Sequence, residues 1–197
     1  MSNNHLISVF LQHPNLPMTS LKPFHATDLF RVNAVNLDVL TENYNISFYL
    51  SYLTQWPSLF FSAENPQGEI TGYMMGKAEG RGKEWHGHVT CLSVAADYRR
   101  IGLARTLVDN LERRSEDPYD AYFIDLFVRA SNALAIGMYR NFGYSVYRRV
   151  VGYYGSDDGV DNEDAFDMRK PLKRDKNRES IREDGENFRV RPEDVYL

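Results

Sequence analysis

The hexapeptide Arg99-Arg100-Ile101-Gly102-Leu103-Ala104 stands between a predicted strand at 85–94 and a predicted amphipathic helix that starts at Leu103. Gly102 lets the backbone approach a ligand closely, and Ala104 keeps that approach open. Amides at the start of a helix have no intrahelical acceptors and carry the positive end of the helix dipole. The turn therefore predicts an anion site suited to a pyrophosphate, and the neighbouring arginines add positive charge.

Two further points limit what this turn means by itself. It lacks the GxxxxGK[ST] pattern, which disfavours a P-loop nucleotide-hydrolysing mechanism. Taken alone, it is also compatible with a basic turn that contains an ordinary glycine. The elements around the turn must therefore decide between the two interpretations.

The surrounding pattern predicts one mixed α/β domain, because strand and helix periodicities succeed one another along the chain. The predicted elements are strand 21–24, helix 28–37, helix 46–56, strands 59–64, 69–79 and 85–94, a helix from Leu103, strand 122–128, helix 132–141 and strands 144–153 and 165–170. Thr27 and Ser131 are the expected N-caps of the helices that follow them, and Gly143 is an expected C-cap. Strand 122–128 has the apolar composition of a central strand that is covered on both faces.

Composition narrows the classes of function. The 197 residues are 43% hydrophobic, which suffices for one buried core, and the formal net charge of −4 disfavours a general nucleic-acid binder. Cys91 is the single cysteine, so an internal disulfide and a cysteine-rich zinc site are excluded. No run approaches the roughly 20 apolar residues of a membrane span, and no membrane association is expected.

Three segments are predicted along the chain. Residues 1–17 lack the features of a signal peptide and are expected to form an optional N-terminal extension or a disordered tail. Residues 18–172 carry the domain pattern. Residues 173–197 mix charges of both signs and are expected to form an extension that packs weakly on its own.

The order strand, Arg99-x-x-Gly102-x-Ala104, helix, strand, helix resembles the GCN5-related N-acetyltransferase (GNAT) superfamily. The second helix adds Asn132-x-x-Ala135-x-x-x-Tyr139, which is similar to the second cofactor element of that superfamily. The resemblance implies a single GNAT-type domain with a mixed, mostly antiparallel sheet that is flanked by helices. It also implies that strands 85–94 and 122–128 are central, parallel and splayed, with acetyl-CoA entering the gap.

Other segments resemble catalytic subunits of eukaryotic N-terminal acetyltransferases. The segments similar to both the NatA and the NatB type include 40–44 and 86–88, whereas 28–31, 47–50, 55–57, 75–80 and 125–129 are closer to the NatB type. This resemblance implies a cytoplasmic, ribosome-associated enzyme that acts on nascent chains starting Met-Asp, Met-Glu, Met-Asn or Met-Gln. It also implies a heterodimer with a large helical-repeat auxiliary subunit.

The resemblance also assigns the cofactor contacts. Leu92 and Val94 are implied to offer backbone groups to the pantetheine arm of acetyl-CoA, and Asn132 is implied to lie beside that arm. The pyrophosphate is implied to bind at Arg99, Arg100, Gly102, Leu103 and Ala104. Acetyl-CoA is the expected cosubstrate, and no metal is expected.

Direct attack on the thioester is chemically feasible, because an N-terminal amine has a pKa near ~8 and is partly neutral at pH 7. Cys91 lies in the middle of a predicted strand without a base fixed beside it, so no acyl-enzyme is expected. Tyr139 follows Asn132 by two helical turns and so shares its face. The resemblance places this tyrosine beside the sulfur, as the general acid or the hydroxyl that orients the thioester; the alternative is a packed helix tyrosine.

His86 and His88 alternate on one strand face, a spacing that only weakly suggests a metal site. The resemblance instead places His88 against the substrate's second residue, where imidazole can bond a carboxylate or an amide. Thr90 shares this face and is expected to help. The alternative is a strand histidine whose hydrogen bonds are satisfied within the protein.

Further peptide contacts are implied by resemblance. Tyr44 is expected to wall the methionine pocket, and Glu42 either accepts a proton through water or shapes the loop. Tyr153 and Tyr154 open the last hairpin loop; Tyr154 is favoured for binding the peptide backbone, and one of the two is expected to relay a proton. A NatA-type enzyme and a non-catalytic acyl-CoA-binding subunit remain as alternatives, although the intact turn and Tyr139 argue against the second.

Overall fold

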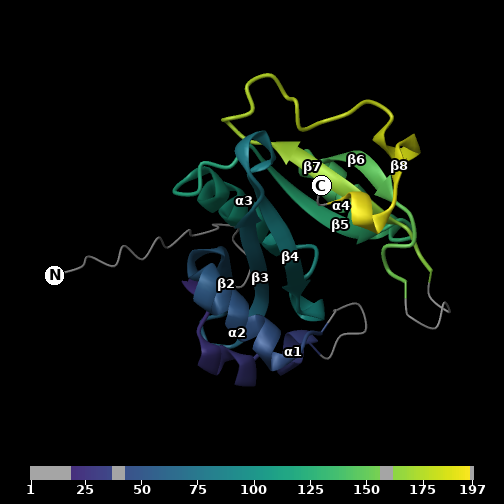
Figure 1. Ribbon diagram of the computed structural model, residues 1–197. Helices are drawn as coiled ribbons and strands as arrows, with labels where there is room; N and C mark the ends of the chain where they lie inside the picture. The colour runs from purple at the N-terminus through teal and green to yellow at the C-terminus, as the bar shows by residue number, and fades with distance from the viewer. Residues whose placement is uncertain (1–18, 37–42, 156–161, 196–197) are drawn as a thin grey trace. The chain divides into compact units, whose positions relative to one another are not determined.

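The computed structural model describes residues 19–36, 43–155 and 162–195 (Figure 1). The chain divides into two compact units, one from Met1–Lys77 with Thr90–Arg114 and the other from Ala78–Val89 with Ser115–Leu197. The predicted extension at residues 1–17 lies outside the described residues. No helix in the described part of the chain is long and apolar enough to cross a membrane.

The first unit is built on antiparallel strands. Its elements are β1 (Ser20–Pro23), α1 (Asn33–Asn36), α2 (Ile46–Gln55), β2 (Phe60–Glu64), most of β3 (Ile70–Glu79), the second half of β4 (His86–Val94) and most of α3 (Leu103–Glu116). β2 pairs antiparallel with both β1 and β3. These elements agree with the predicted order, apart from the region of the first helix.

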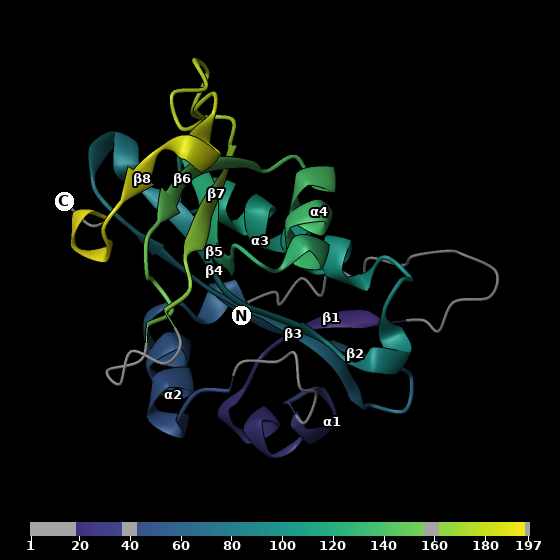
Figure 2. The ribbon, with the colours of Figure 1, turned by 90° about the vertical axis from the view of Figure 1, so that its right-hand side faces the viewer.

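Neighbouring residues of β2 face opposite sides of the strand, so each side receives its own helices. Phe60 stacks on Phe24 at 4.1 Å between ring centroids and belongs to the same core cluster as Tyr49 and Tyr52 of α2. The guanidinium of Arg114 at the end of α3 lies 5.4 Å from the ring centroid of Phe61. Figure 2 shows the corresponding arrangement, with α1 and α2 on one side of β2 and β3 and α3 on the other.

The predicted helix 28–37 is wrong as a continuous element. The chain forms a 3₁₀ helix at Ala26–Phe30 and then the separate short α1. The buried Asp28 accepts hydrogen bonds from the His25 amide at 2.9 Å and from Arg31 Nη1 at 2.6 Å, so the N-cap is His25 and not Thr27. The carboxylate thereby holds a tight turn, since Asp favours local bonds to backbone over a helix interior.

The second unit contains the remaining strands. β5 (Phe123–Arg129) pairs parallel with β4 from His86↔Phe123 to Val89↔Leu126, and the strand order from β4 is β4-β5-β7-β6-β8. Its other elements are α4 (Ala133–Asn141), β6 (Ser145–Val150), β7 (Ala165–Pro171) and β8 (Arg189–Val190). β7 is antiparallel to both β5 and β6, so the predicted mixed, mostly antiparallel sheet with a parallel pair is confirmed. The splaying of this pair stays a prediction.

Two element ends of this unit differ from the predictions. β6 ends at Val150, and the chain turns through 151–154 instead of continuing as a strand. The N-cap of α4 is Asn132, whose side-chain oxygen accepts the Ala135 amide at 3.0 Å, and not Ser131. The Ser131 amide donates to Glu163 Oε1 instead, at 3.0 Å, which ties the start of α4 to the segment before β7.

The C-terminal segment packs more firmly than its composition suggests. β8 pairs parallel with β6, and the guanidinium of Arg182 lies 4.5 Å from the ring centroid of Tyr147 and 3.6 Å from that of Phe188. Asp175 and Ser180 are buried in this segment. The expectation of weak packing missed these contacts, because charge-rich composition does not reveal which side chains find partners.

Asp175→Ala should loosen this segment. Asp175 accepts hydrogen bonds from the Glu179 amide, the Ser180 amide and the Ser180 hydroxyl at 2.6–2.9 Å. Leaving these donors unpaired should cost about 1–3 kcal/mol, seen as roughly 10- to 100-fold faster amide exchange at both residues. Unchanged exchange, or an equal change in the exposed-site control Glu183→Ala, would contradict the assignment.

The stabilisation of the C-terminal segment by Asp175 should depend on pH. Burial raises the pKa of Asp175, but the bonds from Ser180 and Glu179 outweigh burial and lower it. Since the folded-state pKa lies below the unfolded value, the stabilisation is present above about pH 4 and is lost as pH falls through the folded-state pKa. Amide exchange at Ser180 across that range measures it.

Candidate functional site

The predicted anion-binding turn lies in the first unit and has a constrained backbone. Arg100 has φ of 64° and Gly102 has φ of 88°, both in the left-handed region. A Cβ added at Gly102 would meet no heavy atom within 4 Å, so the backbone conformation and not crowding calls for glycine here. α3 starts directly afterwards at Leu103, which is buried, while Ala104 is half-buried.

The end of β4 is tied to this turn. Leu92 and Val94 are half-buried and alternate with the buried Cys91 and Ser93, so they lie on one strand face. Arg99 Nε donates to the Val94 carbonyl oxygen at 3.0 Å. The guanidinium of Arg99 therefore helps to set the path of the chain between β4 and α3.

The predicted peptide residues of the first unit are connected through α2. The ring of Tyr44 stacks on that of Phe48 at 4.6 Å, and Phe48 lies 4.9 Å from the ring of Tyr52. Thr90 Oγ1 donates to the Tyr52 hydroxyl at 3.0 Å. Tyr44 and Thr90 are thus linked through Phe48 and Tyr52, by two ring contacts and one hydrogen bond. Glu42 lies outside the described residues.

The predicted peptide residues of the second unit form another row. The ring of Phe127 lies 5.8 Å from that of His88 and stacks on that of Tyr153 at 4.7 Å and 8°. Tyr154 meets Tyr153 edge-on at 5.1 Å. The guanidinium of Arg129 lies 4.2 Å from the Tyr154 ring centroid. His88 is therefore brought close to Tyr153 and Tyr154, which lie far from it in sequence, with Phe127 between them.

His88 has a fixed partner in the neighbouring strand. Its Nδ1 lies 2.7 Å from Oδ1 of Asp125, a carboxylate that is 3% exposed. Burial raises the pKa of Asp125, but the charges of His86, His88 and Arg169 outweigh burial and hold that pKa well below its ordinary range. Asp125 is therefore ionised at neutral pH.

The two α4 residues of the prediction have structural surroundings of their own. The Asn132 side chain caps α4. Tyr139 is 7% exposed, and its ring meets those of Phe142 and Tyr144 edge-on at 6.2 and 5.6 Å. These contacts fix the direction of the Tyr139 ring within the second unit.

Comparison with known proteins identifies the family of the chain. Residues 28–144 match the acetyltransferase (GNAT) family. The chain belongs to the GNAT acetyltransferase family. The predicted GNAT fold is therefore confirmed.

Relatives narrow the group further. The chain is 61% identical over 180 residues to the catalytic subunit of the N-terminal acetyltransferase B complex of Schizosaccharomyces pombe, over 90% of this chain and 99% of the relative. Chaetomium thermophilum Naa20 in complex with a bisubstrate analogue has a TM-score of 0.83 at 46% identity, over 90% of this chain and 100% of that chain. The NatB complex bound to CoA and MES has a TM-score of 0.70 at 53% identity, over 78% of this chain and 99% of that chain. This GNAT chain is therefore an N-terminal acetyltransferase of the NatB catalytic-subunit group, and acetyl-CoA is its cosubstrate.

Sequence reasoning missed two residues that contact the predicted peptide residues of the second unit, Asp125 and Phe127. Asp125 is a lone acid inside an otherwise apolar buried strand, and such a group needs a charged or hydrogen-bonding partner. That signal marks the acid but does not identify His88 as the partner. The parallel register His88↔Asp125 does.

The structure gives only weak support for a metal site at His86 and His88. One ligand atom each from Glu79, His86 and His88 lie within 4.8 Å of one another. However, His86 Nδ1 lies 2.6 Å from the Glu84 carbonyl oxygen, and Asp125 engages His88 Nδ1. The geometry is that of a hydrogen-bonded charge cluster.

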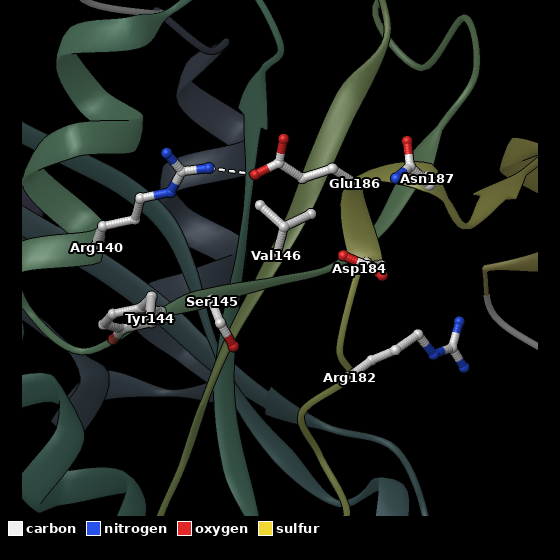
Figure 3. Close-up of a pocket in the computed structure, with 9 residues that line it drawn as sticks. Arg140, Tyr144, Ser145, Val146, Arg182, Asp184, Glu186 and Asn187 are labelled. Carbon is white, nitrogen blue, oxygen red and sulfur yellow. Dashed lines mark hydrogen bonds and ion pairs between the residues drawn. The ribbon is translucent and has the colours of Figure 1, made fainter.

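A pocket of about 520 Å³ lies elsewhere in the second unit of the GNAT chain (Figure 3). It is lined by the end of α4, the start of β6 and the C-terminal segment, and an ion pair between Arg140 and Glu186 spans part of it. No predicted site residue lines this pocket. It is therefore distinct from the residues assigned to catalysis.

Proposed function

We propose that this N-terminal acetyltransferase acts on protein N-termini that start Met-Asp, Met-Glu, Met-Asn or Met-Gln. The observation that carries the proposal is the row His88–Phe127–Tyr153–Tyr154, in which an imidazole oriented by Asp125 is followed by three aromatic rings, two of them tyrosines. An imidazole can bond both carboxylates and amides. The relatives are NatB catalytic subunits, the type for which the sequence resemblance implies this substrate class.

We further propose a cytoplasmic, ribosome-associated heterodimer with a large helical-repeat auxiliary subunit. The relatives include members of a NatB complex, which supports a partner for this chain. Exposed apolar side chains at Phe30 and Ile46 of the first unit, 84% and 66% exposed, are consistent with a protein interface.

The proposed reaction is direct acyl transfer. The neutral α-amine forms a C–N bond to the thioester carbonyl carbon, and the C–S bond of acetyl-CoA then breaks. The nitrogen loses one proton, and the departing thiolate gains one. Positioning and proton transfer are therefore what the enzyme must supply.

Proton transfer is assigned to three residues. Tyr139 donates a proton to the thiolate or orients the thioester. Tyr154 relays the proton from the amine, and Glu42 accepts it through water or shapes the loop. The guanidinium of Arg129, 4.2 Å from the Tyr154 ring centroid, helps to hold that ring in place.

Binding is assigned to the remaining predicted residues. The turn residues Arg99, Arg100, Gly102, Leu103 and Ala104 hold the pyrophosphate, while Leu92, Val94 and Asn132 serve the pantetheine arm. His88 and Thr90 recognise the second residue of the substrate. Tyr44 walls the methionine pocket, and Tyr153 with Tyr154 binds the first peptide group.

Peptide acetylation by the complex with its auxiliary subunit tests the substrate class. Met-Asp, Met-Glu and Met-Asn peptides should be acetylated at least about tenfold faster than Met-Leu, since only they offer a polar group to His88. Preference for a Ser-Glu peptide would move the enzyme to the NatA type. An internal-lysine peptide is the control for attack by other amines.

Gly102→Ala should weaken binding of CoA. Alanine at φ of 88° costs about 1–2 kcal/mol, and relief of that strain would rearrange the turn that holds the pyrophosphate. Calorimetry should show a Kd for CoA about tenfold higher. Gly68→Ala is the matched control, because Gly68 has φ of 80° and equally free space around its Cβ. Equal effects of the two variants on CoA binding would contradict the turn assignment.

Tyr139→Phe should lower kcat about 10²-fold or more with little change in the Kd for CoA, because it removes only the hydroxyl assigned to the leaving thiolate. Single-turnover acetyl transfer with calorimetric CoA binding checks this. Tyr119→Phe, at a half-buried site outside the proposed machinery, should leave kcat unchanged. Full activity of Tyr139→Phe would reduce Tyr139 to a packing residue.

A further inference from the structure

One acidic residue, Glu163, is bonded to two segments that carry predicted site residues of the second unit. Its backbone carbonyl oxygen accepts the Tyr154 amide at 3.0 Å. Its side chain accepts the Ser131 amide at 3.0 Å through Oε1 and Arg129 Nη1 at 3.1 Å through Oε2. Glu163 therefore connects the turn after β6, which carries Tyr154, with the loop between β5 and α4.

Arg129 contacts both Glu163 and Tyr154. Its Nη1 binds the Glu163 carboxylate, while its guanidinium lies 4.2 Å from the Tyr154 ring centroid. Tyr154 is thereby held at two places, at its amide by Glu163 and at its ring by Arg129. Because the carboxylate fixes the direction of the guanidinium, loss of its charge should release the Tyr154 ring while the Tyr154 amide stays bonded.

The next residue, Asp164, holds the backbone of the same turn. Its carbonyl oxygen accepts the Ala130 amide at 2.9 Å, and its Oδ1 accepts the Gly152 amide at 2.9 Å. The backbone near Tyr154 is therefore fixed by bonds that do not involve the Glu163 side chain. Removal of the Glu163 charge should for this reason leave the path of the chain unchanged.

The donors around Glu163 favour its charged form. The hydrogen bonds from Ser131, followed by the one from Arg129, lower the pKa of Glu163, so the carboxylate is ionised at neutral pH. A glutamine at this position could still accept the Ser131 amide through its oxygen, but it would lack the charge that pairs with Arg129. Glu163→Gln therefore separates the ion pair from the bond to the start of α4.

We propose that Glu163 is a positioning residue for peptide binding: through Arg129 it holds the Tyr154 ring, so that the tyrosine hydroxyl meets the first peptide group of the substrate. The inference rests on the proposed role of Tyr154 in binding the peptide backbone. Since every substrate has that backbone, Glu163 acts on all of them alike and does not select the second residue. The capping bond of Asn132 does not involve Glu163, so CoA binding is independent of the Glu163 charge.

The experiment measures kcat/KM for Met-Asp and Met-Asn peptides with the complete complex. Glu163→Gln should lower kcat/KM about fivefold for both peptides, because it removes one partly exposed ion pair and releases one cation–π contact. Calorimetry should show an unchanged Kd for CoA. Glu186→Gln is the matched control, since it breaks an exposed ion pair with Arg140 outside the proposed site, and it should leave kcat/KM unchanged.

A double-mutant cycle with Tyr154→Phe shows whether Glu163 acts through Tyr154. Tyr154→Phe removes the hydroxyl that meets the peptide, so the addition of Glu163→Gln should lower kcat/KM by less than about twofold further. Arg129→Gln breaks the same ion pair from the other side and should reproduce the effect of Glu163→Gln. It tests the inference even where Glu163→Gln fails to fold, which thermal melting reveals.

The outcomes separate the inference from the function on which it rests. Where Tyr154→Phe lowers kcat/KM, an unchanged kcat/KM in folded Glu163→Gln overturns the inference alone. A full fivefold further loss in the Tyr154→Phe background does the same, because Glu163 would then act elsewhere. A loss confined to one of the two peptides would place Glu163 at the second residue and also overturn it. Full activity of Tyr154→Phe overturns the proposed role of Tyr154 and the inference together.

Discussion

The second unit depends on the carboxylate of Asp125, which is buried in the sheet although burial of an unpaired charge is strongly unfavourable. Asp125 lies on β5 with 3% exposure, and it is tolerated because His88 and His86 face it from β4 while Arg169 lies opposite it on β7. Arg169 is itself held between the rings of Phe123 and Tyr147, at 4.4 and 3.7 Å. Three strands thus contribute to one buried charge cluster, in which Asp125 and Arg169 each have more than one oppositely charged or hydrogen-bonding neighbour.

This cluster explains why the two faces of β5 differ. Ile124 and Leu126 are fully buried apolar residues, whereas Asp125 and Phe127 point to the face that carries the histidine and the tyrosines. The apolar face packs in the core, and the charges on the polar face orient the side chains around Asp125. A histidine whose Nδ1 is tied to a buried carboxylate presents its other nitrogen in a fixed direction, which a freely rotating side chain would not do.

The elements that could be predicted from sequence are those specified by local chemistry. The turn at 99–104 follows from one glycine and its arginines, and the alternation of β4 places His88 on the same face as His86. Long-range register was beyond reach, because nothing near His88 in sequence indicates that Asp125 stands opposite it. Two local predictions failed because polar side chains compete for backbone hydrogen bonds. Asp28 closes a tight turn within a helical pattern, and Asn132 is the N-cap where Ser131 was expected.

The chemistry of the proposed substrates gives a reason for histidine at position 88. Aspartate and glutamate offer only acceptors, while asparagine and glutamine offer both a donor and an acceptor. A lysine or arginine would serve the acids but would present no acceptor to an amide NH₂ group, and an uncharged donor would bind the acids less strongly. Imidazole has two ring nitrogens, each of which can donate or accept a hydrogen bond, and Asp125 engages one of them. The buried carboxylate thereby leaves the other nitrogen for the second residue of the proposed substrates.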